Sequence, residues 1–181
     1  QKLMKKNSVV FDIKGFIPKK IISKSLWRQI MNNYNGIWFF GLSGVGKSYA
    51  SSLIKAKRKN TVVIDGDVVR EYLSHDLGYS IKDRNIQIKR MYGIAKIIIN
   101  SNYFPVVSSV WMNLEISKLL KKEKINLIKI EADMKEIFKS HKTYKNKSNV
   151  VGKDISFNRF KHQKIINNKD RKFWMELKKL I

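Results

Sequence analysis

Short apolar runs alternate with longer amphipathic stretches from residue 37 to the end of the chain. The predicted strands are Ile37–Phe40, Thr61–Ile64, Phe104–Val107 and Leu127–Ile130. The predicted helices are Lys47–Lys59, Asp83–Asn100, Asn113–Lys124 and Asp170–Ile181. Apolar strands that alternate with helices are typical of a parallel sheet buried on both faces. The pattern therefore predicts a three-layer α/β domain with a parallel sheet of about five strands.

Two of the predicted helices have recognisable features: one has a residue suited to cap its first turn, and the other has an apolar face. Asp83 is placed to cap the first turn of Asp83–Asn100. In the last helix, the residues Trp174, Leu177 and Leu180 recur at helical spacing and are expected to form its packed face.

The segments outside this alternating pattern divide the chain. The pattern in residues 1–36, which Pro18 interrupts, predicts a short strand at Val9–Ile13 and a helix at Ser23–Asn33, with a turn between them. We therefore expect an N-terminal extension at 1–36, which is a candidate dimer contact, and one main domain at 37–181. Polar and basic residues dominate His141–Asn158, which predicts a mobile loop, and we expect it to act as a lid over the strand ends.

Length and composition restrict the class of protein. A chain of 181 residues is long enough for one hydrophobic core and short of two. Apolar runs approaching about 18 residues are absent from the sequence, so we expect no membrane span. The sequence has no cysteine, which excludes disulfides, thiolate metal sites and cysteine nucleophiles and fits a reducing cytoplasm.

The charge is strongly positive. The chain has 38 Lys and Arg against 14 Asp and Glu, a net charge of +24. Such a balance fits a polyanionic partner, but the lysines are spread along the chain and Lys, Ile and Asn are abundant together, as an A/T-rich genome would make them. A basic balance without a binding motif is weak evidence for nucleic acid, and we expect the positive field to attract small anionic nucleotides instead.

The segment Gly41-Leu-Ser-Gly-Val-Gly-Lys-Ser48 matches the P-loop pattern G-x-x-x-x-G-K-[ST] and lies between a predicted strand and a predicted helix. Glycines let the backbone N–H groups turn inward, and the helix N-terminus adds a favourable dipole for phosphate. Lys47 is expected to reach the β- and γ-phosphates of ATP, and the Ser48 hydroxyl to join the shell of Mg²⁺. The residues expected to bind ATP are Gly41, Ser43, Gly44, Gly46, Lys47, Ser48 and Tyr49.

Two carboxylates follow the second predicted strand, in Asp65-Gly-Asp67. Ligands of parallel sheets gather at the carboxyl ends of the strands, so a second substrate is expected here. Asp65 is a candidate to order a magnesium-bound water or to accept the proton of a substrate hydroxyl, and Asp67 to hold the acceptor. Arg70 lies three residues on and can grip an anionic group. An ordinary Asp-Gly turn with a capping Asp67 is the alternative.

Further segments follow this site in a recognisable series. They are Asp65-Gly-Asp-Val-Val-Arg70, Asp76-Leu-Gly-Tyr-Ser80, Asp83-Arg84, Asp133–Lys139 and Asn149-Val-Val-Gly152. Together with the P-loop they resemble the motifs D-G-D-N-V-R, D-L-G-F-S, D-R, D-P-K-G-L-Y-K and N-F-T-G of adenylylsulfate kinases. Those P-loop enzymes phosphorylate the ribose 3′-hydroxyl of adenylyl sulfate. The resemblance covers about Gly36 to Gly152.

The resemblance implies roles for individual residues. Lys47, Asp65 and Lys139 would be catalytic, with Lys139 bringing positive charge to the transferring phosphate. Ser48 and Asp65 would hold Mg²⁺. The acceptor nucleotide would be bound by Asp67, Arg70, Tyr79, Arg84, Gln87, Val110, Trp111 and Val150, with Tyr79 stacking on its base.

The sequence departs from the family pattern mainly on the acceptor side. The family's Asn in D-R-x-x-N is Gln87, its serine in F-I-S-P aligns with Trp111, and its second stacking Phe is Val150. Two acceptors therefore stay open: adenylyl sulfate, or the smaller cytidine diphosphoramidate of a capsule-synthesis relative. A third reading, of a different class, is a P-loop ATPase that binds nucleic acid.

Overall fold

The computed structural model describes residues 34–140, 150–157 and 159–180. The chain divides into two units, 1–33 and Tyr34–Ile181, and only the second contains described residues. The predicted strand Val9–Ile13, the predicted helix Ser23–Asn33 and most of the predicted loop His141–Asn158 lie outside the described residues.

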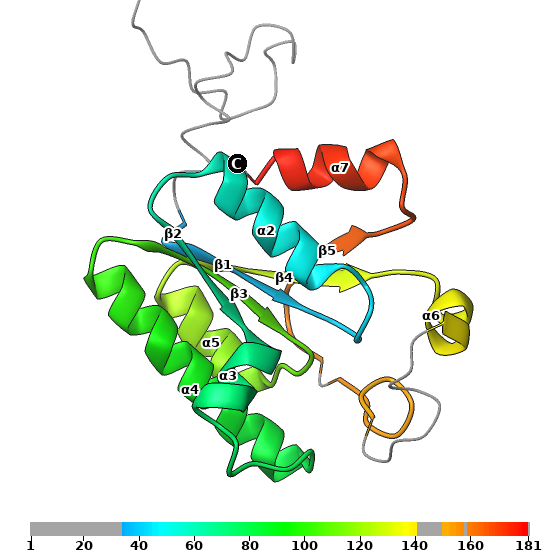
Figure 1. Ribbon diagram of the computed structural model, residues 1–181, viewed down its shortest axis with the longest axis horizontal. Helices are drawn as coiled ribbons and strands as arrows, with labels where there is room; N and C mark the ends of the chain where they lie inside the picture. The colour runs from blue at the N-terminus through cyan, green and yellow to red at the C-terminus, as the bar shows by residue number, and fades with distance from the viewer. Residues whose placement is uncertain (1–33, 141–149, 158, 181) are drawn as a thin grey trace, which may run out of the picture. The chain divides into compact units, whose positions relative to one another are not determined.

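The second unit is built on a five-stranded, wholly parallel sheet (Figure 1). Its strands are β1 (Gly36–Phe40), β2 (Thr61–Asp65), β3 (Phe104–Ser109), β4 (Ile125–Glu131) and β5 (Gln163–Ile166). Their order in the sheet is β2-β3-β1-β4-β5, which places β1 at the centre. The predicted parallel sheet is confirmed. The strand β5 escaped prediction because only Ile165 among its four residues is buried, so it has no apolar run.

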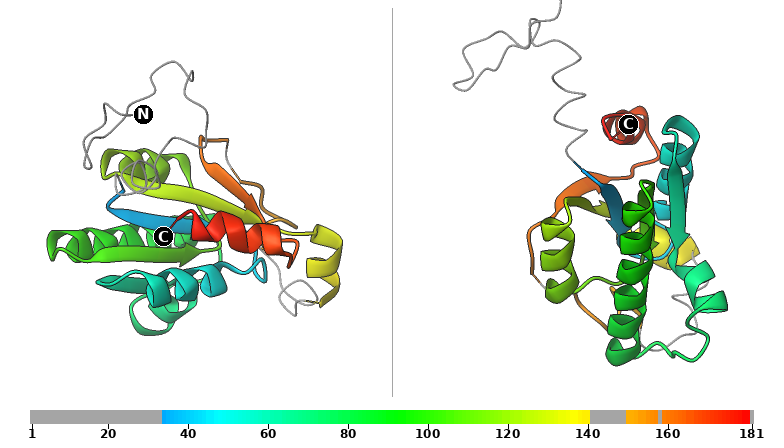
Figure 2. Two further views of the ribbon diagram at one scale, coloured as in Figure 1. Left: turned by 90° about the horizontal axis from the view of Figure 1, so that it is seen from above. Right: turned by 90° about the vertical axis from the view of Figure 1, so that its left-hand side faces the viewer.

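Helices cover both faces of the sheet. They are α2 (Lys47–Lys57), α3 (Gly66–Tyr72), α4 (Ile81–Asn100), α5 (Leu114–Lys122), α6 (Met134–Ser140) and α7 (Arg171–Lys178). In Figure 1, α2 and α7 lie on one side of the sheet and α4 and α5 on the other, and the turned views of Figure 2 agree. Among the described residues, no helix has both the length and the apolarity needed to cross a membrane.

The start of α4 and the packed face of α7 refine two sequence predictions. Ser80, not Asp83, is the N-cap of α4: the Ser80 hydroxyl accepts from the Asp83 N–H, and the Asp83 carboxylate accepts from the Ser80 N–H. This reciprocal capping box satisfies two N–H groups that the helix leaves unpaired. In α7 the residue buried with Leu177 is Phe173, whereas Trp174 stays 39% exposed, so its assignment to the packed face was wrong.

The central strand β1 connects the core to the carboxyl end of β3. All of Ile37, Trp38, Phe39 and Phe40 are buried, because neighbouring strands and both helix layers surround them. The Trp38 indole N–H donates to Ser109 Oγ over 2.8 Å, and that hydroxyl donates to the carbonyl oxygen of Trp111 over 2.8 Å. A core side chain therefore fixes the segment that follows β3.

We expect Trp38→Phe to lower the free energy of unfolding by about 1–3 kcal/mol, because it removes the buried donor to Ser109 and leaves a small void. Urea unfolding of the two proteins measures the change. Trp174→Phe is the control, since Trp174 lies at the surface, and it should change stability by less than about 0.5 kcal/mol. Equal effects of the two substitutions would contradict this account of the core.

Candidate functional site

The P-loop joins β1 to α2 in a path that only glycine permits at its base. Gly41 has a φ of 143°, and a Cβ there would lie 2.3 Å from the carbonyl oxygen of Ile130 on β4. Gly44 and Gly46 also have positive φ values, of 84° and 97°. Left-handed residues in a turn aim successive N–H groups toward one point, and α2 begins at Lys47 immediately afterwards. The loop is therefore built to hold an anion.

Lys47 is nearly buried beneath this loop. Its side chain is 8% exposed, and its ammonium donates to the carbonyl oxygen of Leu42 over 2.7 Å. Burial lowers the pKa of Lys47 to about 8, an effect that the nearby carboxylates of Asp67 and Asp65 partly offset. A poorly hydrated ammonium next to a phosphate cradle is well placed to bind a polyphosphate.

Asp65, the last residue of β2, contacts the first turns of α2 and α3. Its Oδ2 accepts from the Ser48 hydroxyl over 2.8 Å, and its Oδ1 accepts from the Asp67 N–H over 3.0 Å, which caps α3. A hydroxyl and a carboxylate are the hard oxygen donors that Mg²⁺ prefers. Within the described part of the chain, no group of three or more His, Cys, Asp or Glu side chains could hold a metal. The donor set thus fits Mg²⁺ bound largely through a substrate's phosphates.

Two arginines converge on Tyr79 at the other end of the site. The guanidinium carbons of Arg70 and Arg84 lie 4.7 and 5.6 Å from the centroid of its ring. Backbone carbonyls hold both arginines: Arg70 donates to Leu77 and Gly78, and Arg84 donates to Tyr79 itself. Burial, and to a lesser degree the charge of Arg70, lowers the pKa of Arg84. This arrangement offers an aromatic face beside two cations, which suits an anionic nucleotide.

Gln87 and Trp111 lie close to the Arg70–Tyr79–Arg84 cluster and form a wall of the same part of the site. The Gln87 amide N–H donates to the Gly66 carbonyl over 3.0 Å, while its buried Oε1 has no hydrogen-bond partner among the described residues. The Trp111 indole N–H donates to Asn85 Oδ1 over 2.8 Å, and its ring stacks on Phe157 with centroids 5.9 Å apart. Trp111 is therefore a fixed wall and not a mobile side chain.

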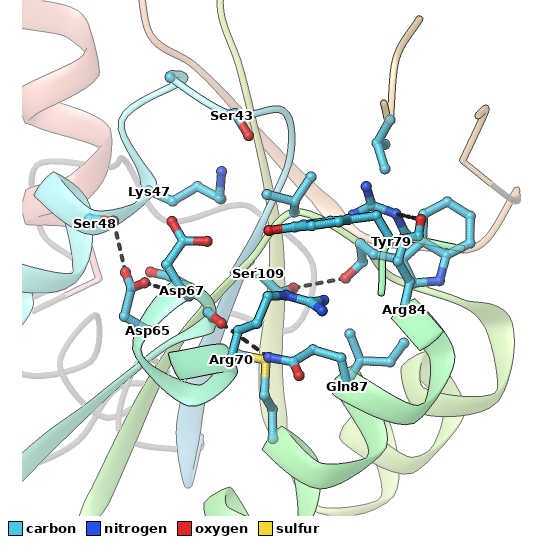
Figure 3. Close-up of a pocket in the computed structure, with 18 of the residues that line it drawn as sticks. Ser43, Lys47, Ser48, Asp65, Asp67, Arg70, Tyr79, Arg84, Gln87 and Ser109 are labelled. Atoms are coloured by element: carbon cyan, nitrogen blue, oxygen red, sulfur yellow. Dashed lines mark hydrogen bonds between the residues drawn. The ribbon is translucent and has the colours of Figure 1, made fainter. Parts of the chain in front are cut away.

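Both halves open into one cavity of about 1130 Å³. Figure 3 shows Lys47, Ser48, Asp65 and Asp67 toward one side of it and Tyr79, Arg84 and Gln87 toward the other. The predicted site residues that line it are Ser43, Gly44, Gly46, Lys47, Ser48, Tyr49, Asp65, Asp67, Arg70, Tyr79, Arg84, Gln87, Val110, Trp111 and Val150. A cavity of this size has room for two ligands of nucleotide size.

Two predicted site residues do not line this cavity. Gly41 lies at the base of the P-loop, where it shapes the backbone. Lys139 is exposed near the end of α6, beyond β4, and its predicted role beside the transferring phosphate stays a prediction.

The structure adds residues that the sequence did not reveal. Asn85 holds the Trp111 indole, and Asn113, which caps α5, donates to the same Asn85 oxygen over 2.9 Å. Asn167, directly after β5, contacts the P-loop backbone. The Trp174 ring meets the Tyr49 ring edge-on, with centroids 5.1 Å apart. Asn85 lies next to the Arg84 of the D-R motif, but no pattern in the sequence pairs any of these residues.

Comparison with known proteins places the chain in a family. The family model described as adenylylsulphate kinase matches residues 34–145. The chain belongs to the adenylylsulfate kinase family. The adenylyl-sulfate kinase of Buchnera aphidicola is 36% identical over 128 residues, which are 66% of this chain and 61% of that protein. The adenylyl-sulfate kinase of Pseudomonas aeruginosa is 37% identical over 78 residues, 41% of this chain and 40% of that protein.

The chain therefore spans less than two thirds of the length of these relatives. Among solved structures, the Mycobacterium tuberculosis APS kinase CysC in complex with AMPPNP and APS has a TM-score of 0.69 at 22% identity. That match covers 82% of this chain and 95% of the other and supports the same fold. An unliganded sugar kinase from Janibacter matches with a TM-score of 0.55 at 8% identity. The family members and this chain thus share the P-loop α/β architecture.

Lys47→Met should raise the free energy of unfolding of the nucleotide-free protein by about 1–2 kcal/mol near pH 7. The pKa of Lys47 falls from near 10.5 in the unfolded chain to about 8 in the folded protein, so the folded state holds the charged form at a cost. Between these two values the unfolded state binds more protons, and this group makes the wild type more stable as pH rises. The advantage of the methionine variant should therefore vanish by about pH 10.5.

Urea unfolding at both pH values measures this difference. Lys55→Met, at an exposed position of the same helix, is the matched control and should show no pH-dependent gain. A Lys47→Met protein that is less stable than the wild type near neutral pH would contradict the inferred cost of burying this ammonium.

Proposed function

We propose that this protein is an ATP-dependent kinase that transfers the γ-phosphoryl group of ATP to the ribose 3′-hydroxyl of adenylyl sulfate. The observation that carries the proposal is one cavity that joins a P-loop, with its Lys47 and the Ser48–Asp65 pair, to the Arg70–Tyr79–Arg84 cluster. The first half suits a nucleoside triphosphate and the second suits an anionic nucleotide. Membership in the adenylylsulfate kinase family supports the same assignment.

The donor half acts by positioning and by charge. Backbone N–H groups of the P-loop hold the β- and γ-phosphates, and the Lys47 ammonium lies against the same oxygens. Ser48 and Asp65 would hold Mg²⁺, which when bound neutralises the charge that develops on the phosphates. The Ser48–Asp65 contact of 2.8 Å keeps both oxygens facing one point before the ion arrives. Phosphoryl transfer depends mainly on such alignment and charge neutralisation.

The acceptor half presents the ribose hydroxyl to the γ-phosphorus. Arg70 and Arg84 bind the anionic part of the acceptor, and the half-exposed Tyr79 ring offers a face for its base. Asp65 or Asp67 accepts the proton of the 3′-hydroxyl as its oxygen bonds to phosphorus. The bond between the γ-phosphorus and the bridging oxygen breaks, and ADP leaves with that electron pair.

The curated relatives favour adenylyl sulfate as the acceptor. Those from Buchnera aphidicola and Pseudomonas aeruginosa both carry the name adenylyl-sulfate kinase. Cytidine diphosphoramidate and a role in capsule modification find no support in these comparisons, although a buried Trp111, held by Asn85, lines the acceptor half. Both compounds belong in the first experiment.

That experiment measures ADP release by the purified protein with MgATP and either adenylyl sulfate or cytidine diphosphoramidate. We expect release to depend on adenylyl sulfate, to fall to the blank without an acceptor, and to be lost in Lys47→Ala. Faster release with the cytidine compound would overturn the proposed acceptor. Stimulation by DNA or RNA in place of either nucleotide would overturn the kinase assignment and favour a nucleic-acid-dependent ATPase.

Asp65→Asn should lower kcat by at least about a hundredfold while changing the affinity for ATP by less than about tenfold. The amide keeps the cap on α3 but weakens the hold on Mg²⁺ and cannot accept a proton. Steady-state kinetics and equilibrium nucleotide binding separate the two quantities. Glu115→Gln, an exposed carboxylate on α5, is the control and should leave kcat unchanged. If Asp65→Asn greatly weakened ATP binding but left kcat at saturating ATP unchanged, the assigned role of Asp65 would be wrong.

A further inference from the structure

Asn167 connects the end of β5 to the P-loop. Its backbone N–H donates to the Glu131 carbonyl of β4 over 2.7 Å, which extends the sheet by one residue. Its side-chain Nδ2 donates to the Val45 carbonyl over 2.9 Å, and its Oδ1 accepts from the Lys169 N–H over 2.9 Å. Both the amide nitrogen and the amide oxygen of Asn167 are therefore hydrogen-bonded, and the nitrogen donates to the Val45–Gly46 peptide group of the P-loop.

That hydrogen bond fixes the direction of the Val45–Gly46 peptide. In a planar trans peptide the C=O and the following N–H point in opposite directions. Because the Val45 carbonyl points at Asn167, the Gly46 N–H points away from it. Gly46 lines the cavity, so its N–H is available to a phosphate there.

The loop has backbone hydrogen bonds of its own, from the Val45 N–H to Leu42 and from the Ala50 N–H to Gly46, but among the described residues the donor to the Val45 carbonyl is Asn167. Gly46 has a φ of 97°, and glycine adopts positive and negative φ about equally well, so this peptide can rotate at little cost. A rotated peptide would aim the Val45 carbonyl into the anion site, where it would repel phosphate. Asn167 also packs directly on Gly46, since a Cβ there would lie 2.7 Å from its Nδ2.

We propose that Asn167 is a positioning residue for the nucleotide: its Nδ2–H holds the Val45 carbonyl outward and so keeps the Gly46 N–H facing the phosphates of ATP. This inference rests on the ATP-binding half of the proposed function and not on the identity of the acceptor. The segment between β5 and α7 then determines nucleotide affinity without contacting the reacting atoms.

Two substitutions separate this role from a local structural one. Asn167→Asp has nearly the same shape and keeps the acceptor for the Lys169 N–H, but it replaces the donor to Val45 with an oxygen. Asn167→Ala removes both contacts. We expect each to weaken binding of ATP and ADP by about tenfold or more, with the aspartate at least as weak as the alanine. The KM for the acceptor should change by less than about twofold.

Two controls on the neighbouring residue complete the set. Asn168→Ala and Asn168→Asp change an exposed side chain one residue further on, and the second adds the same charge to the same segment. Both should bind nucleotide as the wild type does. Isothermal titration with ATP and with ADP measures affinity, and thermal unfolding checks that each variant is folded.

A spectroscopic signature reports the peptide itself. An amide proton that gains a phosphate oxygen as acceptor moves downfield in the proton dimension, so in ¹⁵N-labelled protein the Gly46 amide should do so when ATP is added. In Asn167→Asp that shift should be reduced or absent, while the amides of α5 should be unaffected.

Three results would overturn the proposal. The first is an Asn167→Asp protein that binds ATP normally while Asn167→Ala does not, which would assign the effect to the Lys169 contact. The second is normal binding by both Asn167 variants. The third is equal weakening by Asn168→Asp and Asn167→Asp, which would assign the effect to charge. Failure of the proposed function looks different, since the wild type itself would then bind no ATP or release no ADP with adenylyl sulfate.

Discussion

The close approach of Gly41 to the Ile130 carbonyl determines the path of the chain on which the whole site depends. A Cβ on Gly41 would lie 2.3 Å from the Ile130 carbonyl oxygen, so only glycine lets the chain pass this close to β4 as it leaves β1 and enters the P-loop. The parallel order β2-β3-β1-β4 then brings Asp65 and the segment after β3 to the same edge of the sheet. The phosphate cradle and the acceptor wall are thus consequences of one sheet edge.

Burial of the positive side chains Lys47 and Arg84 in this site lowers the stability of the folded protein. Lys47 is withdrawn from water, and its lowered pKa reflects that cost, which the carboxylates of Asp67 and Asp65 repay only in part. Arg84 is likewise buried beside Arg70, another cation, and its pKa is lowered. Burial of these two cations is costly, so anionic substrates bound beside Lys47 and Arg84 would stabilise the folded protein.

The sequence predicted the parts of the site that depend on neighbouring residues. The P-loop and the Asp65-Gly-Asp67 turn each follow a strand within a few residues, so pattern and geometry coincide. It could not predict Asn167, because the contact with Val45 joins positions 122 residues apart in the chain. Nor could it find β5, since one buried residue leaves no periodic signal, or choose Phe173 over Trp174, which depends on how α7 meets the sheet.

The two halves of the cavity are built from different chemical groups, and the positions at which the sequence departs from the family motifs lie mainly in the half around Tyr79. The donor half is made largely of backbone N–H groups held by glycines, so few substitutions there are compatible with phosphate binding. The acceptor half is made of side chains, and Gln87, Trp111 and Val150 can change while the strands and helices that carry them stay in place. By the resemblance to the motif F-I-S-P, Trp111 would take the position of a serine, and Asn85 and Phe157 support its ring from the side and from its face. Selection on the acceptor can therefore act on this wall without disturbing the phosphate cradle.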